Sequence, residues 1–350
     1  MTTHPITLSP DDSQWNIGRT LNWMSERFVG CSQSPRLDAQ LLLARALTCD
    51  RVKLYTQIDK PLSRDERDTL RGMVKRRLAG EPVAYILGVK HWHDMELVVD
   101  RRVLIPRPET ETLFDLLSAW SVPSLESDRL AGRRPVIVDL CTGSGCLALA
   151  FARRFPHALV FGVDVFAEAL DIARENGRRY GVENITWCDP LDVTQRQALH
   201  ACLDAARAQG DGSFVLVANP PYVTSAEWSA LDAGVRDYEP RLALEAGEDG
   251  LDVARSIAAV WDDLKGSFLD GPEPLAGFFG LELADGQPQK LMAMRSPLDL
   301  KPGVIPASPR DYPQNRAFAA ADLEGRVRYL FEHIGCPLPV VDVTQEQDAH

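Results

Sequence analysis

The segment Asn219-Pro-Pro-Tyr222 combines groups that suit a planar amine or amide. Prolines have no N–H, so the Pro220-Pro221 step presents carbonyl acceptors in a stiff backbone, and the side chain of Asn219 adds another carbonyl. These acceptors can receive both protons of one NH2 group, and the ring of Tyr222 offers a face for a planar substituent. The alternative is a rigid turn, although two consecutive prolines rarely follow an apolar central strand. The motif therefore predicts a site that holds the NH2 group of an amide or an aminopurine.

A second motif, Asp139-Leu-Cys-Thr-Gly-Ser-Gly-Cys-Leu-Ala148, has the spacing of a nucleotide-binding loop. Gly143 and Gly145 permit a tight turn and close approach to a ligand, and Asp164 lies where an acid can bind ribose hydroxyls. These residues alone fit NAD, S-adenosylmethionine or a plain strand-to-helix turn. The carboxylate of Asp139 suits a cationic ligand better than a pyrophosphate. Because S-adenosylmethionine carries an ammonium and a sulfonium but no phosphate, the loop favours it as the cofactor.

The pattern around these motifs predicts an α/β fold. Apolar runs typical of buried parallel strands occupy residues 136–140, 159–163, 185–188 and 214–218. Helical patterns separate them, and the alternating order implies a Rossmann-like, doubly wound sheet with right-handed crossovers. Ligands in such sheets bind outside the carboxyl ends of the strands, which is where both motifs lie.

The N-terminal part is predicted to be a small helical domain over residues 1–85. Ile17, Leu21, Met24 and Phe28 recur at helical spacing, and a capping box at Ser63–Glu66 starts a later helix.

Residues 86–108 are predicted to form a β-hairpin and an extended linker, with a hairpin strand over 92–99. The remaining residues, 109–350, are assigned to the α/β domain. A helix is expected to begin near Glu109, and the polar stretch 121–135 is expected to be a linker or long loop.

Composition narrows the class of protein further. The 350 residues contain no run of about 18 apolar residues and no secretory signal, so we expect neither a membrane span nor export. The net charge of -12 argues against direct binding of nucleic acid. Seven cysteines without a CxxC pair indicate reduced thiols in a cytoplasmic compartment and no metal site.

The two motifs, taken together with Arg107-Pro-Glu-Thr-Glu111, resemble the HemK/PrmC family of protein-glutamine N5-methyltransferases. Residues 34–43 and 80–88 resemble the helical substrate-recognition domain of that family. Residues 239–251 and 322–328 resemble its later segments. The Asn-Pro-Pro-Tyr motif alone is shared with adenine-N6 methyltransferases, but its combination with the Arg-Pro-Glu-Thr-Glu segment is more specific.

The resemblance implies a class I S-adenosylmethionine-dependent methyltransferase. It would methylate the glutamine amide in the Gly-Gly-Gln (GGQ) motif of class I peptide chain release factors. We expect a monomer that contacts its substrate twice, through the N-terminal helices and through the pocket. The segment Asn219, Pro220, Pro221 and Tyr222 would hold that amide and carry catalysis by alignment.

The resemblance also assigns the cofactor contacts. It implies binding by Asp139 and by the loop Cys141, Thr142, Gly143, Ser144 and Gly145, which would wrap the methionine part. It further implies that Asp164 binds the ribose and that Asp189 reads the adenine amino group. Arg107 and Glu109 would shape a lid, and Asn219 would border the cofactor.

The sequence departs from the family pattern in three places. Pro190 stands where relatives often carry an aromatic residue that packs on adenine, a contact that Trp187 could supply instead. The expected Glu-Ile-Gly strand reads Glu282-Leu-Ala284, with Gln287 at the matching offset, and the segment 296–315 is longer than in relatives.

Four other functions compete with this assignment. A glutamine of a ribosomal protein, or adenine in RNA or DNA, could be the methylated group, although the acidic net charge disfavours the latter. A nicotinamide dehydrogenase would leave the Asn-Pro-Pro-Tyr motif unused. A non-catalytic adaptor would be expected to lose Asn219 or the glycine pair.

Overall fold

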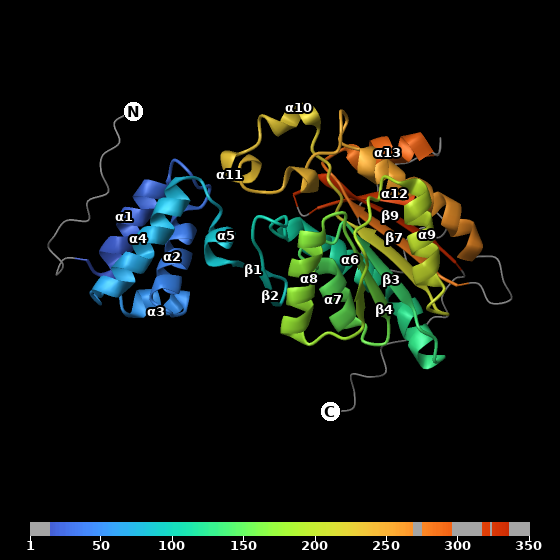
Figure 1. Ribbon diagram of the computed structural model, residues 1–350, viewed down its shortest axis with the longest axis horizontal. Helices are drawn as coiled ribbons and strands as arrows, with labels where there is room; N and C mark the ends of the chain where they lie inside the picture. The colour runs from blue at the N-terminus through green and yellow to red at the C-terminus, as the bar shows by residue number, and fades with distance from the viewer. Residues whose placement is uncertain (1–14, 269–274, 296–316, 323, 336–350) are drawn as a thin grey trace. The chain divides into compact units, whose positions relative to one another are not determined.

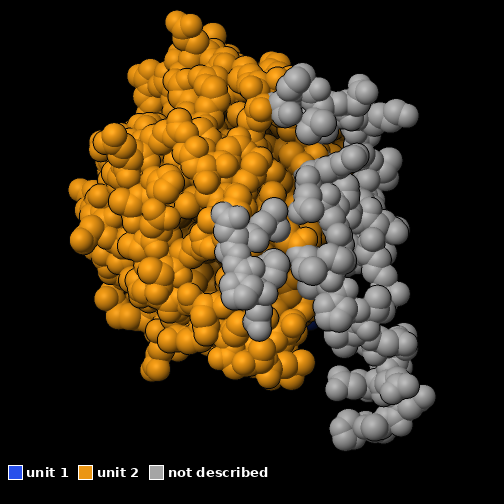
Figure 2. All heavy atoms as spheres, turned by 90° about the vertical axis from the view of Figure 1, so that its right-hand side faces the viewer, with its two compact units in different colours: residues 1–89, 232–238 blue, residues 90–231, 239–350 orange. Residues whose placement is uncertain are grey.

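The computed structural model describes residues 15–268, 275–295, 317–322 and 324–335 (Figure 1). The chain divides into two compact units, residues 1–89 with 232–238, and residues 90–231 with 239–350. Figure 2 shows one face of the larger unit, which carries both predicted motifs. No helix among the described residues is long and apolar enough to cross a membrane.

The smaller unit is helical, as the sequence predicts. Its helices are α1 (Ile17–Phe28), α2 (Pro35–Ala46), α3 (Arg51–Thr56), α4 (Arg64–Leu78) and α5 (Val83–Leu87), and the short α11 (Ala233–Arg236) belongs to the same unit. The capping box is confirmed, because Ser63 accepts from the N–H of Glu66 while the Glu66 carboxylate accepts from the N–H of Ser63. The four residues at helical spacing in α1 are all buried.

A hairpin follows α5, which ends at Gly88 in a left-handed conformation. Its strands are β1 (Val89–Trp92) and β2 (Met95–Val98), so the single strand predicted over 92–99 is wrong. The chain reverses at His93, whose φ of 52° is incompatible with a continuous strand. His91 and His93 are exposed, as expected for a solvated face.

The larger unit is built on a seven-stranded sheet of order β5-β4-β3-β6-β7-β9-β8. Its strands are β3 (Val136–Leu140), β4 (Leu159–Val163), β5 (Ile185–Trp187), β6 (Phe214–Ala218), β7 (Gly277–Glu282), β8 (Ala317–Ala321) and β9 (Val327–Ile334). The strands β3 to β7 pair in parallel, and β9 is antiparallel to both its neighbours. The doubly wound sheet predicted from the apolar runs is therefore confirmed.

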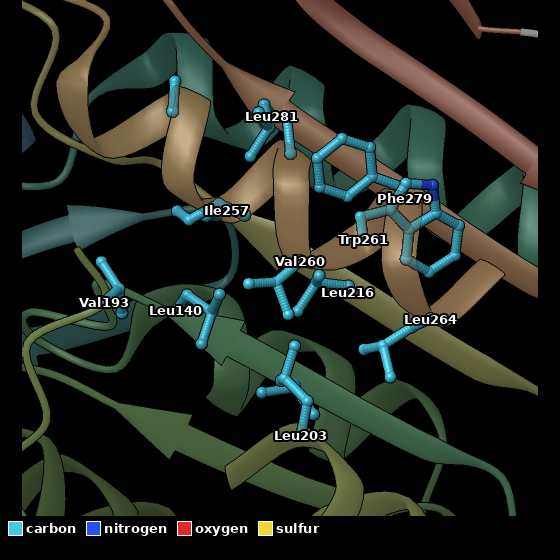
Figure 3. Close-up of a cluster of buried hydrophobic side chains, with 14 of the residues drawn as sticks. Leu140, Val193, Leu203, Leu216, Ile257, Val260, Trp261, Leu264, Phe279 and Leu281 are labelled. Atoms are coloured by element: carbon cyan, nitrogen blue, oxygen red, sulfur yellow. The ribbon is translucent and has the colours of Figure 1, made fainter. Parts of the chain in front are cut away.

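Helices cover both faces of the sheet (Figure 1). On one face α6 (Pro108–Leu130) and α7 (Cys146–Arg154) pack over the strands, and on the other lie α9 (Arg196–Arg207) and α12 (Asp252–Leu264). Figure 3 shows the second interface, where Trp261 of α12 stacks on Phe279 of β7 with ring centroids 5.3 Å apart. The remaining helices are α8 (Ala167–Tyr180), the short α10 (Ser225–Trp228) and α13 (Gln287–Arg295).

The linker expected over residues 121–135 is wrong for most of its length, because α6 continues to Leu130. Pro123 lies inside this helix and removes one backbone donor, which normally disfavours a helix. The buried face nevertheless continues through Ser121, Ser124 and Leu125 to Asp128. The Asp128 carboxylate accepts from the Ser213 N–H and pairs with Arg133. This end of α6 is therefore held by polar contacts rather than by apolar packing alone. The proline-rich segment 296–315 lies outside the described residues.

Candidate active site

The register of the sheet brings the two motifs to one edge. Leu140, Ala218 and Leu281 are register partners at the carboxyl ends of the three central strands β3, β6 and β7. The residues that follow them therefore meet at the same edge, where ligands bind in doubly wound sheets. A cavity of about 330 Å³ opens there, and its lining includes Cys141, Gly143, Asp164, Asn219 and Pro221.

The glycine loop is held in an unusual backbone conformation. Cys141, Gly143 and Gly145 all have positive φ, at 57°, 53° and 82°. For Cys141 this is a strained conformation, of the kind that surrounding structure maintains at ligand sites. The N–H of Gly143 donates to Asp164 Oδ2 at 2.8 Å, and Asn176 of α8 donates to the Ser144 carbonyl at 2.9 Å. The loop is thus fixed from two sides.

Asp139 lies beneath the loop and is completely buried. Its Oδ2 accepts from Thr142 Oγ1 at 2.5 Å and from the Ala148 N–H at 3.0 Å, whereas Oδ1 has no hydrogen-bond partner among the described residues. Burial is the largest cause that raises the pKa of Asp139 to about 7, and the nearby charge of Asp164 raises it further. A bound cation would favour the ionised form, so this carboxylate fits a ligand that carries positive charge.

Asp164 lies in the cavity wall with both carboxylate oxygens on backbone donors. Oδ2 accepts from Gly143 and Oδ1 accepts from the N–H of Phe166 at 3.0 Å. Burial raises the pKa of Asp164. Each oxygen keeps a further lone pair for a ligand hydroxyl, as ribose binding requires. The positive ligand implied by Asp139 and the hydroxyls implied by Asp164 together fit S-adenosylmethionine.

The resemblance assigns the contact with adenine to Asp189 and to the position of Pro190, but other residues form the cavity wall beyond Asp164. Asp189 and Pro190 are exposed and are not among the lining residues. Residues 191–194 line this side instead, and Val165 and Phe166 stand at the wall, each 42% exposed.

The ring of Trp187 lies elsewhere, against the backbone of the glycine loop. A Cβ on Gly162 would lie 2.5 Å from that ring and one on Gly145 would lie 2.9 Å from it. Trp187 therefore packs against Gly145 and Gly162 and is not among the residues that line the cavity, and its suggested contact with adenine stays a prediction.

The Asn-Pro-Pro-Tyr segment leaves β6 in a fixed conformation. Asn219 Nδ2 donates to Thr110 Oγ1 at 2.9 Å, which directs the Asn219 carbonyl oxygen away from Thr110. The carbonyl of Tyr222 accepts from Gln287 Nε2 at 2.9 Å. Burial raises the pKa of Tyr222 to about 12, so its hydroxyl stays protonated. Asn219 and Pro221 line the cavity, whereas Pro220 and Tyr222 are not among its lining residues, and the Tyr222 ring packs against the hydrophobic core. The role of this ring in holding a planar group stays a prediction.

Arg107 and Glu109 brace the structure beside the cavity and are not among its lining residues. Arg107 Nη2 lies 2.7 Å from Oε1 of the buried Glu239, whose Oε2 accepts from the Ile105 N–H. The carbonyl of Glu109 accepts from the Tyr329 hydroxyl at 2.9 Å. Residues 102–104, just before this segment, do line the cavity.

Two polar residues beside the motif did not stand out in the sequence as site residues. Thr110 and Glu282 are 2% and 0% exposed, and burial raises the pKa of Glu282 to about 7. The signal that could have drawn attention to Glu282 is a carboxylate at the end of the apolar run Gly277–Glu282.

The strand order, the glycine loop and the acid at the end of β4 define a class I S-adenosylmethionine-dependent methyltransferase. Residues 137–219 match a family model described as a methyltransferase domain, and residues 19–88 match the PrmC N-terminal domain. The chain is 37% identical over 294 residues to the release factor glutamine methyltransferase of Chlorobaculum tepidum, which covers 79% of this chain and 94% of the relative.

Relatives with the same description in Rhodopirellula baltica and Geobacter sulfurreducens are 36% and 35% identical, covering 75% and 81% of this chain and 83% and 89% of theirs. The chain belongs to the release factor glutamine methyltransferase family, as the sequence resemblance indicated. Among solved structures, the hMettl16 catalytic domain in complex with MAT2A 3'UTR hairpin 6 aligns with a TM-score of 0.42 and 12% identity. That alignment covers 67% of this chain and 74% of that chain, and the likeness carries no argument about function.

Proposed function

We propose that this protein transfers a methyl group from S-adenosylmethionine to the side-chain amide nitrogen of the glutamine in the GGQ motif of class I release factors. The observation that carries the proposal is the orientation of Asn219. Its NH2 group is taken up by Thr110, and the residue lines the same cavity as the glycine loop and Asp164. Its carbonyl oxygen is therefore available to accept from an NH2 group placed beside the cofactor.

The residues of this chain act by alignment. An amide nitrogen is a poor nucleophile because its lone pair is delocalised into the carbonyl. Asn219 Oδ1 and the carbonyl of Pro220 accept hydrogen bonds from its two N–H groups, which fixes the nitrogen and favours the positive charge that develops on it. As the new N–C bond forms and the S–C bond of the cofactor breaks, one of these N–H protons is released to water, which leaves a neutral N-methyl amide. Orientation of this kind can contribute roughly 7–11 kcal/mol. S-adenosylmethionine, when bound, supplies an electrophilic methyl group.

The cofactor contacts follow from the cavity. Cys141, Gly143 and Asp164 line it directly, and Asp139 contributes its charge from beneath the loop. Thr142 and Ser144 are buried and shape the loop, with Gly145 at the start of α7. Asp189 and Pro190 would need to approach the adenine from the exposed side of the cavity.

We propose residues 1–85 as the substrate-recognition domain, 86–108 as the connecting segment and 109–350 as the methyltransferase domain. The family model that covers residues 19–88 supports the first of these. The protein would act as a monomer in the cytoplasm and without direct contact to nucleic acid. The net charge of -12 and the six free cysteines among the described residues support this setting.

Methyl transfer from labelled S-adenosylmethionine to a purified class I release factor tests the proposal. Wild-type protein should label the release factor but not a variant whose GGQ is changed to GGA, and Asn219→Ala should lose the activity. Tyr222→Phe keeps the ring and should retain most activity, whereas Tyr222→Ala should not. Label on the GGA substrate would contradict the assignment, and label on ribosomal protein or on RNA alone would replace it.

A further inference from the structure

A buried carboxylate with no role in the reaction described above lies next to the Asn-Pro-Pro-Tyr segment. Glu282 is the last residue of β7, and its neighbour Leu281 is the register partner of Ala218, the residue before Asn219. Its side chain is fully buried, and neither carboxylate oxygen makes a well-formed hydrogen bond with a described residue. A buried, unpaired carboxylate costs stability, so its presence at this place calls for a functional reason.

Thr110 connects this carboxylate to Asn219. Thr110 is 2% exposed, and its hydroxyl accepts from Asn219 Nδ2 at 2.9 Å. Helix α6, which carries Thr110, packs on β7, which ends at Glu282, and the interaction of Thr110 with Glu282 favours the ionised carboxylate. A hydroxyl has one proton to donate. When Glu282 is ionised, that proton is drawn toward the carboxylate, and the hydroxyl oxygen can then only accept from Asn219.

An asparagine side chain can rotate by half a turn and occupy nearly the same space with its oxygen and nitrogen exchanged. Only the orientation with Nδ2 toward Thr110 presents the carbonyl oxygen to a substrate NH2 group. The reversed orientation would present an NH2 group to another NH2 group, which gives no hydrogen bond.

We propose that Glu282 is a positioning residue that, through the Thr110 hydroxyl, holds the Asn219 amide with its oxygen toward the substrate. The proposal rests on the proposed role of Asn219 in holding the substrate amide. Protonated Glu282 could donate to Thr110, which would then donate to Asn219 and favour the reversed, inactive orientation. Activity should therefore require the ionised form of Glu282.

The charges around Glu282 set the pH at which this happens. Burial is the largest cause that raises the pKa of Glu282 to about 7; the charge of Glu109 raises it, and Thr110, Arg328 and Arg107 lower it. Glu282 also interacts electrostatically with Tyr222, Tyr329 and Cys146. All three stay protonated at neutral pH, because burial raises their pKa. The ionisation of Glu282 therefore falls within the neutral range.

The test compares Thr110→Val, which removes the hydroxyl, with Thr110→Ser, which keeps it. Turnover at saturating S-adenosylmethionine and release factor should fall roughly 10- to 100-fold in Thr110→Val, as expected for a misdirected contact, and by less than about threefold in Thr110→Ser. Wild-type turnover should rise with pH through about 7. Glu282→Gln should lose that rise. The double variant Thr110→Val/Glu282→Gln should be no slower than Thr110→Val alone, because both changes interrupt the same connection from Glu282 through Thr110 to Asn219.

Folding and cofactor binding are checked by thermal unfolding and by titration with S-adenosylmethionine. The proposal is overturned if Thr110→Val turns over like Thr110→Ser, or if Glu282→Gln keeps the wild-type pH profile. If that happens while Asn219→Ala is inactive, the proposed function stands and only the positioning role fails. Full activity of Asn219→Ala would overturn both.

Discussion

Replacing Asp139 by Asn should make the stability of the cofactor-free protein respond differently to pH. The folded protein resists ionisation of this buried carboxyl, whose pKa is about 7 against an ordinary value of 3.8. A raised acid pKa stabilises the folded state fully below the unfolded pKa and loses that contribution as the pH rises through the folded pKa. At 1.36 kcal/mol per pKa unit, the loss between pH 4 and pH 8 is about 4 kcal/mol.

Asparagine removes this titration but preserves the shape. Its carbonyl oxygen can replace Oδ2 and accept from Thr142 and Ala148, while its NH2 group replaces the unpartnered Oδ1. Any constant cost of that NH2 group cancels when two pH values are compared. The free energy of unfolding of Asp139→Asn minus that of wild type should therefore rise by up to about 4 kcal/mol from pH 4 to pH 8.

Urea unfolding of both proteins at a series of pH values, without cofactor, measures this difference. The same variant should bind S-adenosylmethionine more weakly, because the negative charge opposite a cationic ligand is gone. If Asp139→Asn is more stable than wild type at pH 8 and binds the cofactor more weakly, the Asp139 carboxylate strengthens cofactor binding and lowers the stability of the cofactor-free protein. A stability difference that stays flat across the pH range would refute the reasoning.

Three further predictions, made with four substitutions, test other parts of the structure. The pKa of His333 is lowered to about 4 by burial, so wild-type stability should decline as the pH falls from about 6.5 to 4, and His333→Phe should remove about 3 kcal/mol of that decline in urea unfolding. Gly145→Ala places a side chain at a φ of 82° and 2.9 Å from the Trp187 ring, so it should cost at least about 1–3 kcal/mol from backbone strain alone. Gly72→Ala, in open space within α4, should stabilise by up to about 1 kcal/mol. Arg107→Met leaves the carboxylate of Glu239 buried without its partner and should cost about 3 kcal/mol at pH 8 but less at pH 5, where that acid can take up a proton.

The sequence predicted the central strands well because each is a short, continuous apolar run between helical patterns. Residues 136–140, 159–163 and 214–218 match the observed strands β3, β4 and β6 residue for residue. The C-terminal half of α6 could not be found in this way. Its buried face is made of serines and an aspartate, and the tertiary contacts of Asp128 that hold it are not visible in a local pattern.

The site was predictable where chemistry lies in one contiguous motif. The glycine loop and the Asn-Pro-Pro-Tyr segment both meet the cavity, as their position after two strands implies. Thr110 and Glu282 could not be assigned a role from sequence, because residues at positions 110, 219 and 282 meet only through the packing of α6 on the sheet and the register of β6 with β7. The exposure of Asp189 likewise depends on the path of the chain after β5.

The most direct test of the account is the location of the methyl group in the product. Wild-type protein, S-adenosylmethionine and an intact class I release factor would be incubated, and the product mapped by tandem mass spectrometry. The account predicts a single methyl group on the side-chain nitrogen of the GGQ glutamine, absent when Asn219→Ala replaces the wild type. A methyl group on any other residue, or equal modification by the variant, would contradict it.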